Sequence, residues 1–387
     1  MTHDMTSLDL LDRLIAFDTV SSKSNLELID FVEAYLAALG IPSRRTVSPD
    51  GEKANLFATL GPSEAGGIVL SGHTDVVPVD GQPWTSDPFV LTHRDGRLYG
   101  RGTSDMKAFV AVCLALAPWA AQGALRKPLH FAFTFDEEVG CTGVGHLIDD
   151  VVRNLPLPAA VIIGEPTSMK LVNAHKGGYG FHTTVVGKEA HSSQLHRAGH
   201  AINAAVELIQ FIHQIQEDKR RTAPADSPFE PPYSTLTVGT IQGGTARNIV
   251  PRECSFAWEM RPIPGDDAEE VIERFNRHAE TVVLARLRET APEAEIVTVV
   301  ESRVPPLEPE TDGPAEALVR LLTGANQTQV VSYCTEGGLF QRAGMSTVIC
   351  GPGSIDQAHK PDEFIEISQI EACEDFVRRL IVGAATA

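Results

Sequence analysis

Residues 67–75 read GIVLSGHTD, an apolar run of strand length that ends in a glycine and leads at once into a histidine and an aspartate. Runs of the same kind occupy residues 54–60, 129–135 and 159–164. Continuous apolar runs of this length are typical of strands buried on both faces. Helical spacing of apolar residues predicts helices over 8–15, 28–39, 105–122 and 141–153. The first 175 residues are therefore expected to form an α/β layer with a largely parallel sheet.

The pattern changes near Gly177. Strands and helices are predicted in the order β-α-β-β-α-β, which is the ferredoxin-like arrangement, over 178–187, 200–218, 234–241, 253–261, 266–289 and 295–300. The first of these helices is predicted to carry Ile202, Val206, Ile209 and Ile212 on one face.

The α/β pattern resumes after Pro305-Pro306, with helices predicted over 313–323, 336–343 and 367–383 and strands over 328–333 and 346–350. We therefore predict a catalytic domain in two parts, 1–176 and 303–387. A smaller ferredoxin-like domain, 177–302, is inserted between them.

Composition excludes several classes of protein. The 387 residues include 32 basic and 51 acidic ones, a formal net charge of −19, and the tightest basic cluster is Lys219-Arg220-Arg221. A nucleic-acid partner is not expected, because phosphates need such clusters. No apolar run approaches the about 20 residues of a membrane span, and the acidic start does not resemble a secretory signal. Six cysteines without a C-x-x-C pair predict reduced thiols in a cytoplasmic protein.

Residues able to bind metal follow the predicted strands. They are His73, Asp75, Asp105, Glu137, Glu138, Glu165 and, far downstream, His359. Ligands of open α/β sheets bind beyond the carboxyl ends of the strands, so these side chains could converge on one edge. Imidazole and carboxylate ligands suit Zn²⁺, Co²⁺ or Mn²⁺.

Two such ions lie about 3.5–4 Å apart and need a bridging carboxylate. Asp105 is the best candidate for the bridge, because a short side chain at a helix start projects into the edge of the sheet. His73 and Glu165 could complete one ion, and Glu138 and His359 the other.

This assignment leaves Glu137 free to take a proton from a bridging water, and Asp75 could orient His73.

Each residue alone has an ordinary structural alternative: a hydrogen-bonded histidine, a helix-capping aspartate, a solvated Glu-Glu pair. Their occurrence together after successive strands, within glycine-rich turns, favours the metal site.

Several strings resemble the di-zinc aminoacylase and carboxypeptidase family. They are SGHTDVVPV (71–79), WTSDPF (84–89), DGRLYGRGTSDMK (95–107), DEEVG (136–140), GEPT (164–167), HSS (191–193) and GPGSIDQAHKPDEF (351–364). The resemblance follows the chain in order over nearly its whole length. It implies a di-metal peptidase-like fold with an inserted dimerisation domain.

The resemblance also implies chemistry. Two Zn²⁺ per subunit, or Co²⁺, would be held by the same five ligands. Glu137 would be the general base, and Asp75 would be the carboxylate behind the ligand His73. In this family a further donor to the oxyanion comes from the inserted domain across a homodimer interface, and the matching residue is His191. A surface-loop histidine is the alternative for that residue.

Substrates of this family carry an α-carboxylate, which a guanidinium or backbone N–H groups can bind. Arg261 and Asn248 are the expected side-chain donors, by position and by resemblance, and Arg247 is a weaker competitor. A structural ion pair is the alternative for Arg261. Gly353 could offer a backbone N–H.

The segment CTEGGLF (334–340) resembles the acetylornithine deacetylase branch. There Glu336 could face the cationic side chain of ornithine or be an exposed acid at a helix start. We expect hydrolysis of N-alpha-acetyl-L-ornithine to L-ornithine and acetate, for arginine biosynthesis. The alternatives are a succinyl-diaminopimelate desuccinylase, a broader N-acyl amino-acid hydrolase or, from another class, an inactive metal-binding interaction protein.

Overall fold

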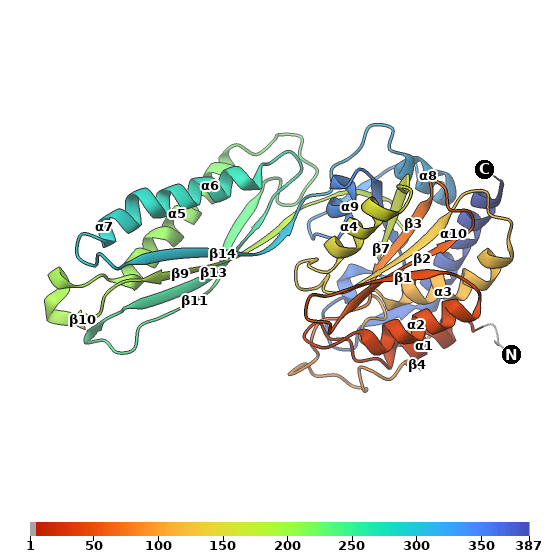
Figure 1. Cartoon of the computed structure of the whole chain (residues 1–387), viewed down its shortest axis with the longest axis horizontal. Helices are drawn as coiled ribbons and strands as arrows, with labels where there is room; N and C mark the ends of the chain where they lie inside the picture. The colour runs from red at the N-terminus through yellow and green to blue at the C-terminus, as the bar shows by residue number, and fades with distance from the viewer. Residues whose placement is uncertain (1–4, 387) are drawn as a thin grey trace. The chain divides into compact units, whose positions relative to one another are not determined.

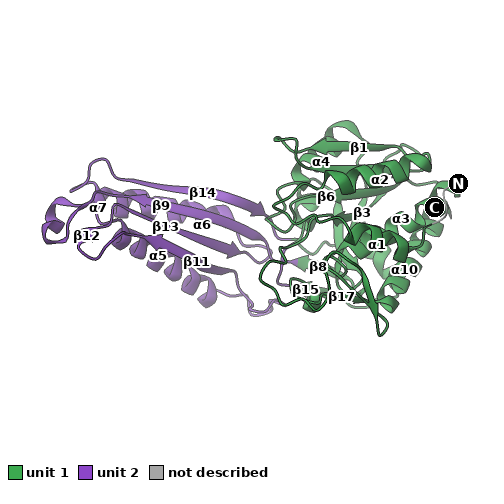
Figure 2. Ribbon diagram, turned by 90° about the horizontal axis from the view of Figure 1, so that it is seen from below, with its two compact units in different colours: residues 1–174, 307–330, 335–387 green, residues 175–306, 331–334 purple. Residues whose placement is uncertain are grey.

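The computed structural model describes residues 5–386, and the chain divides into two compact units (Figure 2). Unit 1 comprises residues 1–174, 307–330 and 335–387, and unit 2 comprises residues 175–306 and 331–334. Unit 2 is thus an insertion in the chain of unit 1, with one short later segment added to it. Within the described range, no helix has the length and apolar character needed to cross a membrane.

Unit 1 is built on an eight-stranded sheet (Figure 1). In spatial order its strands are β1 (Ser43–Val47), β2 (Ala54–Leu60), β6 (Leu129–Thr134), β3 (Ile68–His73), β7 (Ala160–Pro166), β16 (Ser346–Gly351), β8 (Val172–His175) and β15 (Gln329–Val331). The central strands β6, β3, β7 and β16 run parallel, whereas β1, β2 and β8 pair antiparallel with their neighbours. The predicted α/β fold with a parallel-rich sheet is confirmed.

Seven α-helices of unit 1 lie among its described residues. They are α1 (Ser7–Ile15), α2 (Leu26–Ala38), α3 (Lys107–Gln122), α4 (Val144–Asn154), α8 (Pro314–Thr323), α9 (Gly337–Arg342) and α10 (Ile367–Thr386). Helix α3 is buried along most of its length because α1, α2 and α10 surround it. Helices α4 and α9 pack together elsewhere on the sheet. Burial on both faces explains why the central strands read as continuous apolar runs.

Unit 2 is a four-stranded antiparallel sheet with two long helices. Its elements are β9 (Gly178–Val186), α5 (Ala201–Arg221), β11 (Thr235–Gly243), β13 (Glu253–Arg261), α6 (Ala268–His278) and β14 (Glu295–Val304). The spatial order β11-β13-β9-β14 confirms the ferredoxin-like arrangement. Helix α6 continues through a π-helical stretch, Ala279–Leu284, into the short α7 (Ala285–Leu287). The core centres on Trp258, whose ring lies 4.0 Å from Phe181 and 4.8 Å from Phe275.

The predicted apolar face of α5 is confirmed only in part. The buried face of α5 holds Ala201, Ala204, Ala205, Leu208, Ile212 and Ile215, whereas Val206 is exposed. Ile212 belongs to both faces, and Ile202 and Ile209 are partly buried against the same core, so the buried face includes part of the predicted stripe together with Leu208, Ile215 and the alanines.

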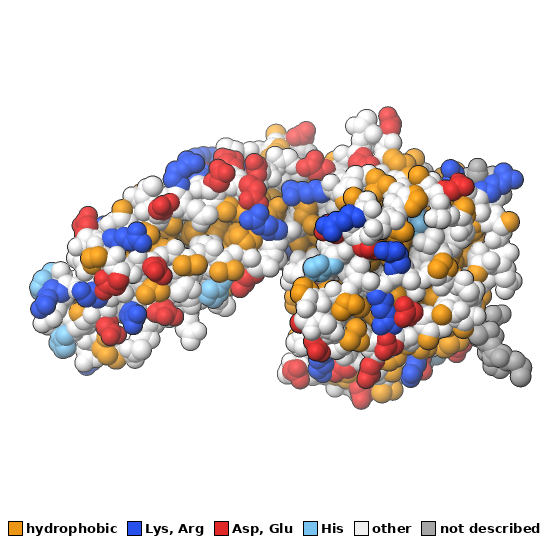
Figure 3. All heavy atoms as spheres, viewed as in Figure 1, with side chains coloured by type: hydrophobic (Ala, Val, Ile, Leu, Met, Phe, Trp, Pro, Cys, Tyr) orange, Lys and Arg blue, Asp and Glu red, His pale blue; other side chains and the backbone are white. Residues whose placement is uncertain are grey.

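Short pairings supplement the main sheets. Strands β4 (Thr92–Arg94), β5 (Arg97–Tyr99) and β17 (Phe364–Glu366) form a small sheet in unit 1, and β10 (Ala190–His191) pairs with β12 (Ile249–Val250) in unit 2. Strands of two or three residues are too short to carry a periodic signal, and the sequence analysis does not predict them. On the face in Figure 3, acidic and basic side chains are interspersed.

Candidate metal centre

Most of the predicted metal ligands lie where unit 1's central strands end. His73 is the last residue of β3, Glu165 lies near the end of β7, and Glu137 and Glu138 follow β6. Because β6, β3 and β7 are parallel neighbours, their carboxyl ends meet at one edge of the sheet. Asp105 lies in the turn before α3, which begins two residues later than the predicted helix.

Asp105 stands between the two histidines. Its Oδ1 is 3.0 Å from His73 Nε2, and its Oδ2 is 3.3 Å from His359 Nε2. Glu165 Oε1 lies 3.6 Å from His73 Nε2, and Glu138 Oε2 lies 2.9 Å from His359 Nε2. The structure therefore brings all five predicted ligands together, with one carboxylate oxygen of Asp105 facing each histidine. A bridging ligand of two neighbouring ions requires this disposition.

The cluster carries more negative charge than its histidines neutralise. Burial and neighbouring carboxylates raise the pKa of Glu165 well above its ordinary value, and burial together with Asp105 raises the pKa of Glu138 to about 7. Hydrogen bonds to Asp105 and Glu138 raise the pKa of His359 to about 10. Burial alone would lower the pKa of His73, but Glu165 and Asp105 raise it.

Among the described residues, the ion pairs of these carboxylates are made with the two histidines. Buried carboxylates left partly unneutralised gain from further positive charge, which protons or cations can bring. The mixed imidazole and carboxylate set therefore fits a pair of divalent cations of the zinc type.

Asp75 accepts hydrogen bonds from the backbone that carries Glu137 and Glu138. Its Oδ1 accepts a hydrogen bond from the Glu137 N–H at 3.2 Å, and its Oδ2 accepts from the Glu138 N–H at 3.3 Å. Ser21 Oγ, which the sequence analysis does not single out, donates to Oδ2 at 2.7 Å. His73 Nδ1 lies 2.9 Å from the carbonyl oxygen of Asp75, closer than to its carboxylate. A proton on Nδ1 leaves Nε2 free to bind a cation.

Glu137 remains partly exposed beside the ligands. Its carboxylate lies within 4.8 Å of ligand atoms of His73 and Glu165, and Cys141 Sγ donates to it at 3.5 Å. Burial raises the pKa of Glu137 well above the ordinary range, and Glu138 and Asp105 add to that effect. A carboxylate with a raised pKa at the edge of a cation cluster can accept and return a proton near neutral pH.

Two of the residues predicted to bind substrate also belong to unit 1. Glu336, directly before α9, is 1% exposed rather than an exposed acid, and burial raises its pKa to about 7. Ser71 Oγ donates to its Oε2 at 3.5 Å, and its Oε1 has no hydrogen-bond partner among the described residues. The Gly353 N–H donates to Gln369 Oε1 at 3.3 Å, so a substrate would have to displace that bond.

The remaining predicted residues lie in unit 2. His191 ends β10 and is exposed, with Nδ1 at 2.8 Å from Ser193 Oγ. Asn248 lies beside it, since its carbonyl oxygen accepts from the Ser192 N–H at 3.0 Å. Arg261, at the end of β13, donates to Glu259 at 3.0 Å and to Cys334 Sγ at 3.2 Å.

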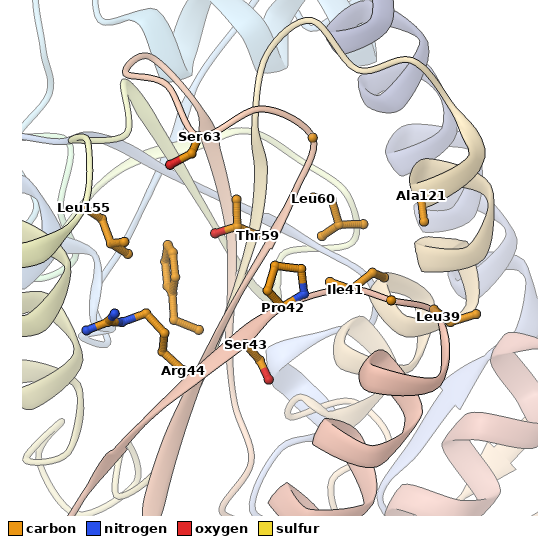
Figure 4. A pocket seen from close by; sticks show the side chains of 13 residues that line it. Leu39, Ile41, Pro42, Ser43, Arg44, Thr59, Leu60, Ser63, Ala121 and Leu155 are labelled. Atoms are coloured by element: carbon orange, nitrogen blue, oxygen red, sulfur yellow. The ribbon is translucent and has the colours of Figure 1, made fainter.

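Unit 1 also holds a cavity of about 500 Å³ away from these ligands (Figure 4). It is lined by residues 39–44, by parts of 57–63 and by Ala121 and Leu155. Arg44, its charged residue, is paired with Asp150 at 2.8 Å. None of the predicted site residues lines this cavity.

Comparison with known proteins identifies the fold and its chemistry. Residues 69–382 match the family described as peptidase family M20/M25/M40. The chain belongs to this family. It is 34% identical over 383 residues to an acetylornithine deacetylase from Proteus mirabilis, covering 97% of this chain and 96% of that protein.

Solved structures of M20 proteins share the fold. A metallo-carboxypeptidase from Sulfolobus solfataricus matches with a TM-score of 0.75 at 17% identity, over 98% of this chain and 99% of that one. A dinuclear metal-binding peptidase from Bacillus subtilis matches with a TM-score of 0.65 at 16% identity, over 97% and 96%. These likenesses show that the chain has the fold of M20 proteins whose structures are known.

Proposed function

We propose that this protein removes the acetyl group from N-alpha-acetyl-L-ornithine, giving L-ornithine and acetate. The observation that carries the proposal is the bridging position of Asp105 between His73 and His359. The near full-length similarity to an acetylornithine deacetylase supports the choice of substrate.

In this proposal His73, Asp105 and Glu165 hold one Zn²⁺, and Asp105, Glu138 and His359 hold the other. Co²⁺ suits the same ligands. If bound there, two divalent cations would supply the means to lower the pKa of water and to polarise the scissile carbonyl. The protein contributes the fixed placement of the ligands, since Asp75 ties the turn of Glu138 to the strand end that carries His73.

Glu137 is the proton carrier of the proposed reaction. It takes the proton of the attacking water and later delivers it to the nitrogen of the leaving ornithine. Its raised pKa supports both steps, because the carboxyl can hold the proton between them. Its partly exposed position leaves it open to substrate.

Residues of unit 2 are assigned to the substrate. We assign His191 to the oxyanion, supplied across a homodimer interface, and Arg261 and Asn248 to the α-carboxylate. The exposure of His191 supports this role, as do the guanidinium of Arg261 and the proximity of Asn248 to His191. Glu336 and Gly353 are assigned to the ornithine side chain and the substrate backbone.

The substrate assignment is tested by kcat/KM on three amides. Metal-stripped protein is reloaded with Zn²⁺ or Co²⁺ and assayed with N-alpha-acetyl-L-ornithine, N-succinyl-diaminopimelate and N-acetylmethionine. The proposal predicts a clear preference for acetylornithine. Preference for another of the three amides would leave the proposed mechanism unchanged and assign a different substrate. Metal binding without turnover of any of them would favour an inactive interaction protein.

A further inference from the structure

A carboxylate outside the ligand set organises the turn that holds Asp105. Glu363 is 1% exposed, and each of its oxygens accepts two hydrogen bonds. Its Oε1 accepts from the N–H groups of Ser104 at 2.8 Å and Asp105 at 3.1 Å. Its Oε2 accepts from the Gly102 N–H at 3.1 Å and from Arg101 Nη1 at 2.8 Å. One side chain thus fixes most of this turn.

The same network reaches the backbone of His359. Arg101 Nη2 donates to Gln82 Oε1 at 2.6 Å, and Gln82 Nε2 donates to the His359 carbonyl oxygen at 3.0 Å. Arg101 Nη1 also donates to the carbonyl oxygen of Lys360 at 3.3 Å. The Trp84 indole donates to Gln82 Oε1 at 3.0 Å, and its ring lies 5.1 Å from the Arg101 guanidinium carbon.

His359 depends on its backbone for its position. Its side chain is 55% exposed, so surrounding atoms do not fix the imidazole by packing. Its φ of +62° lies in the left-handed region, which residues with a side chain adopt uncommonly and which neighbouring contacts can stabilise. The bonds from Gln82 and Arg101 to 359–360 are such contacts.

We propose that Gln82, Arg101 and Glu363 form a positioning clamp that sets the separation between Asp105 and His359. These two residues share one proposed cation, so the clamp determines the affinity of that cation. The inference rests on the metal centre of the proposed function. It adds three residues that touch neither substrate nor metal and act through the ligands.

An ordinary structural role makes a different prediction. A buried Arg–Glu pair that only stabilises the fold would change the melting temperature and leave cation binding by the folded protein unaltered. A clamp changes the affinity and the spectrum of one cation even in protein that is fully folded.

Two variants and a matched control separate these roles. Glu363→Gln keeps the side-chain shape but turns an NH₂ group toward N–H donors. Gln82→Ala removes the bond to the His359 carbonyl together with the acceptor of Arg101 Nη2 and the Trp84 indole, and it leaves the four hydrogen bonds that Glu363 accepts in place. Glu366→Gln makes the same chemical change three residues later, on a carboxylate that pairs with Arg97 at 3.4 Å and is 52% exposed.

Each metal-stripped protein is titrated with Co²⁺, followed by calorimetry and by visible absorption, after circular dichroism has shown that it is folded. We expect two Co²⁺ per chain in the wild type and in Glu366→Gln. In Glu363→Gln one of the two should bind about 10–100-fold more weakly, with altered cobalt absorption. In Gln82→Ala the affinity for the same Co²⁺ should fall by a smaller factor. In both variants kcat should fall while KM changes little.

Other outcomes would overturn the clamp. If Glu363→Gln does not fold, Gln82→Ala decides the matter alone. Wild-type affinity and spectrum in folded Gln82→Ala would overturn the clamp while leaving the metal centre intact. A wild-type protein that binds no Co²⁺ would overturn the proposed function together with the clamp.

Discussion

Glu137 and Glu138 are adjacent glutamates with different surroundings. Glu138 Oε2 lies 2.9 Å from His359 Nε2, whereas the Glu137 carboxylate accepts a hydrogen bond from the Cys141 thiol at 3.5 Å. This difference supports the proposal that Glu137 transfers protons and Glu138 binds a cation.

Replacing Glu137 by glutamine should remove proton transfer and leave the ligands in place. We expect kcat to fall by about 10²–10⁴-fold, with both cations retained on metal analysis. The same replacement at Glu138 should instead lower the cation content. Loss of a cation from the Glu137→Gln variant would show that Glu137 is itself a ligand.

The shifted pKa values of the cluster predict how cation binding depends on pH. With a pKa of about 10, His359 carries a proton at neutral pH in the metal-free protein, and Glu138, at about 7, is half protonated. A cation must displace these protons, so its affinity should rise with pH across roughly pH 6–8. Calorimetry at pH 7 in buffers of different ionisation enthalpy should detect proton release. An affinity independent of pH in that range would contradict this assignment.

At the scale of the elements, the ligands on strands could be predicted and those on loops less completely. His73, Glu138 and Glu165 follow apolar runs, and parallel strands bring their carboxyl ends to one edge. No such rule fixes His359, which lies in a loop whose place depends on the Glu363 network. That network escapes sequence reasoning because its members have no periodic spacing. The buried face of α5 could be predicted only in part, because it also includes three alanines, which give a weak hydrophobic signal.

Close contact between α3 and β7 gives a prediction about Glu165. A Cβ at Gly164 would overlap the buried ring of Phe109 on α3. Gly164→Ala should therefore cost about 1–3 kcal/mol of unfolding free energy and weaken cation binding, because the adjacent Glu165 would move. Gly145 in α4 has open space around it, so Gly145→Ala should leave stability equal or higher by about 0.5–1 kcal/mol. Urea denaturation measures the unfolding free energy of both variants. Equal stability of the two variants would refute this account of the contact.

At the scale of the whole molecule, we propose that unit 2 forms a homodimer. Its outer strands β11 and β14 have unpaired edges, and Ile241, Val297 and Val299 on them are about half exposed. Sheet edges and exposed apolar residues favour association. Sedimentation should give about twice the 41.7 kDa of one chain. A monomer in solution would contradict the assignment of His191 to a partner's reaction.

In the proposed mechanism, His191 of one subunit serves the metal centre of its partner. His191→Ala should reduce kcat by about 10²–10³-fold, as expected for the loss of an oxyanion donor. Cation content should stay at the wild-type value, because the five ligands belong to unit 1. An unchanged kcat would remove His191 from the site.

The central claim is that Asp105 joins two cations into one hydrolytic centre. The most direct measurement is turnover of N-alpha-acetyl-L-ornithine by metal-stripped wild type and Asp105→Ala during titration with Zn²⁺. The account predicts no turnover before Zn²⁺ is added, full activity of the wild type near two equivalents per chain, and no activity of the variant at any equivalent. Turnover by the stripped wild type, or by Asp105→Ala at a comparable rate, would contradict it.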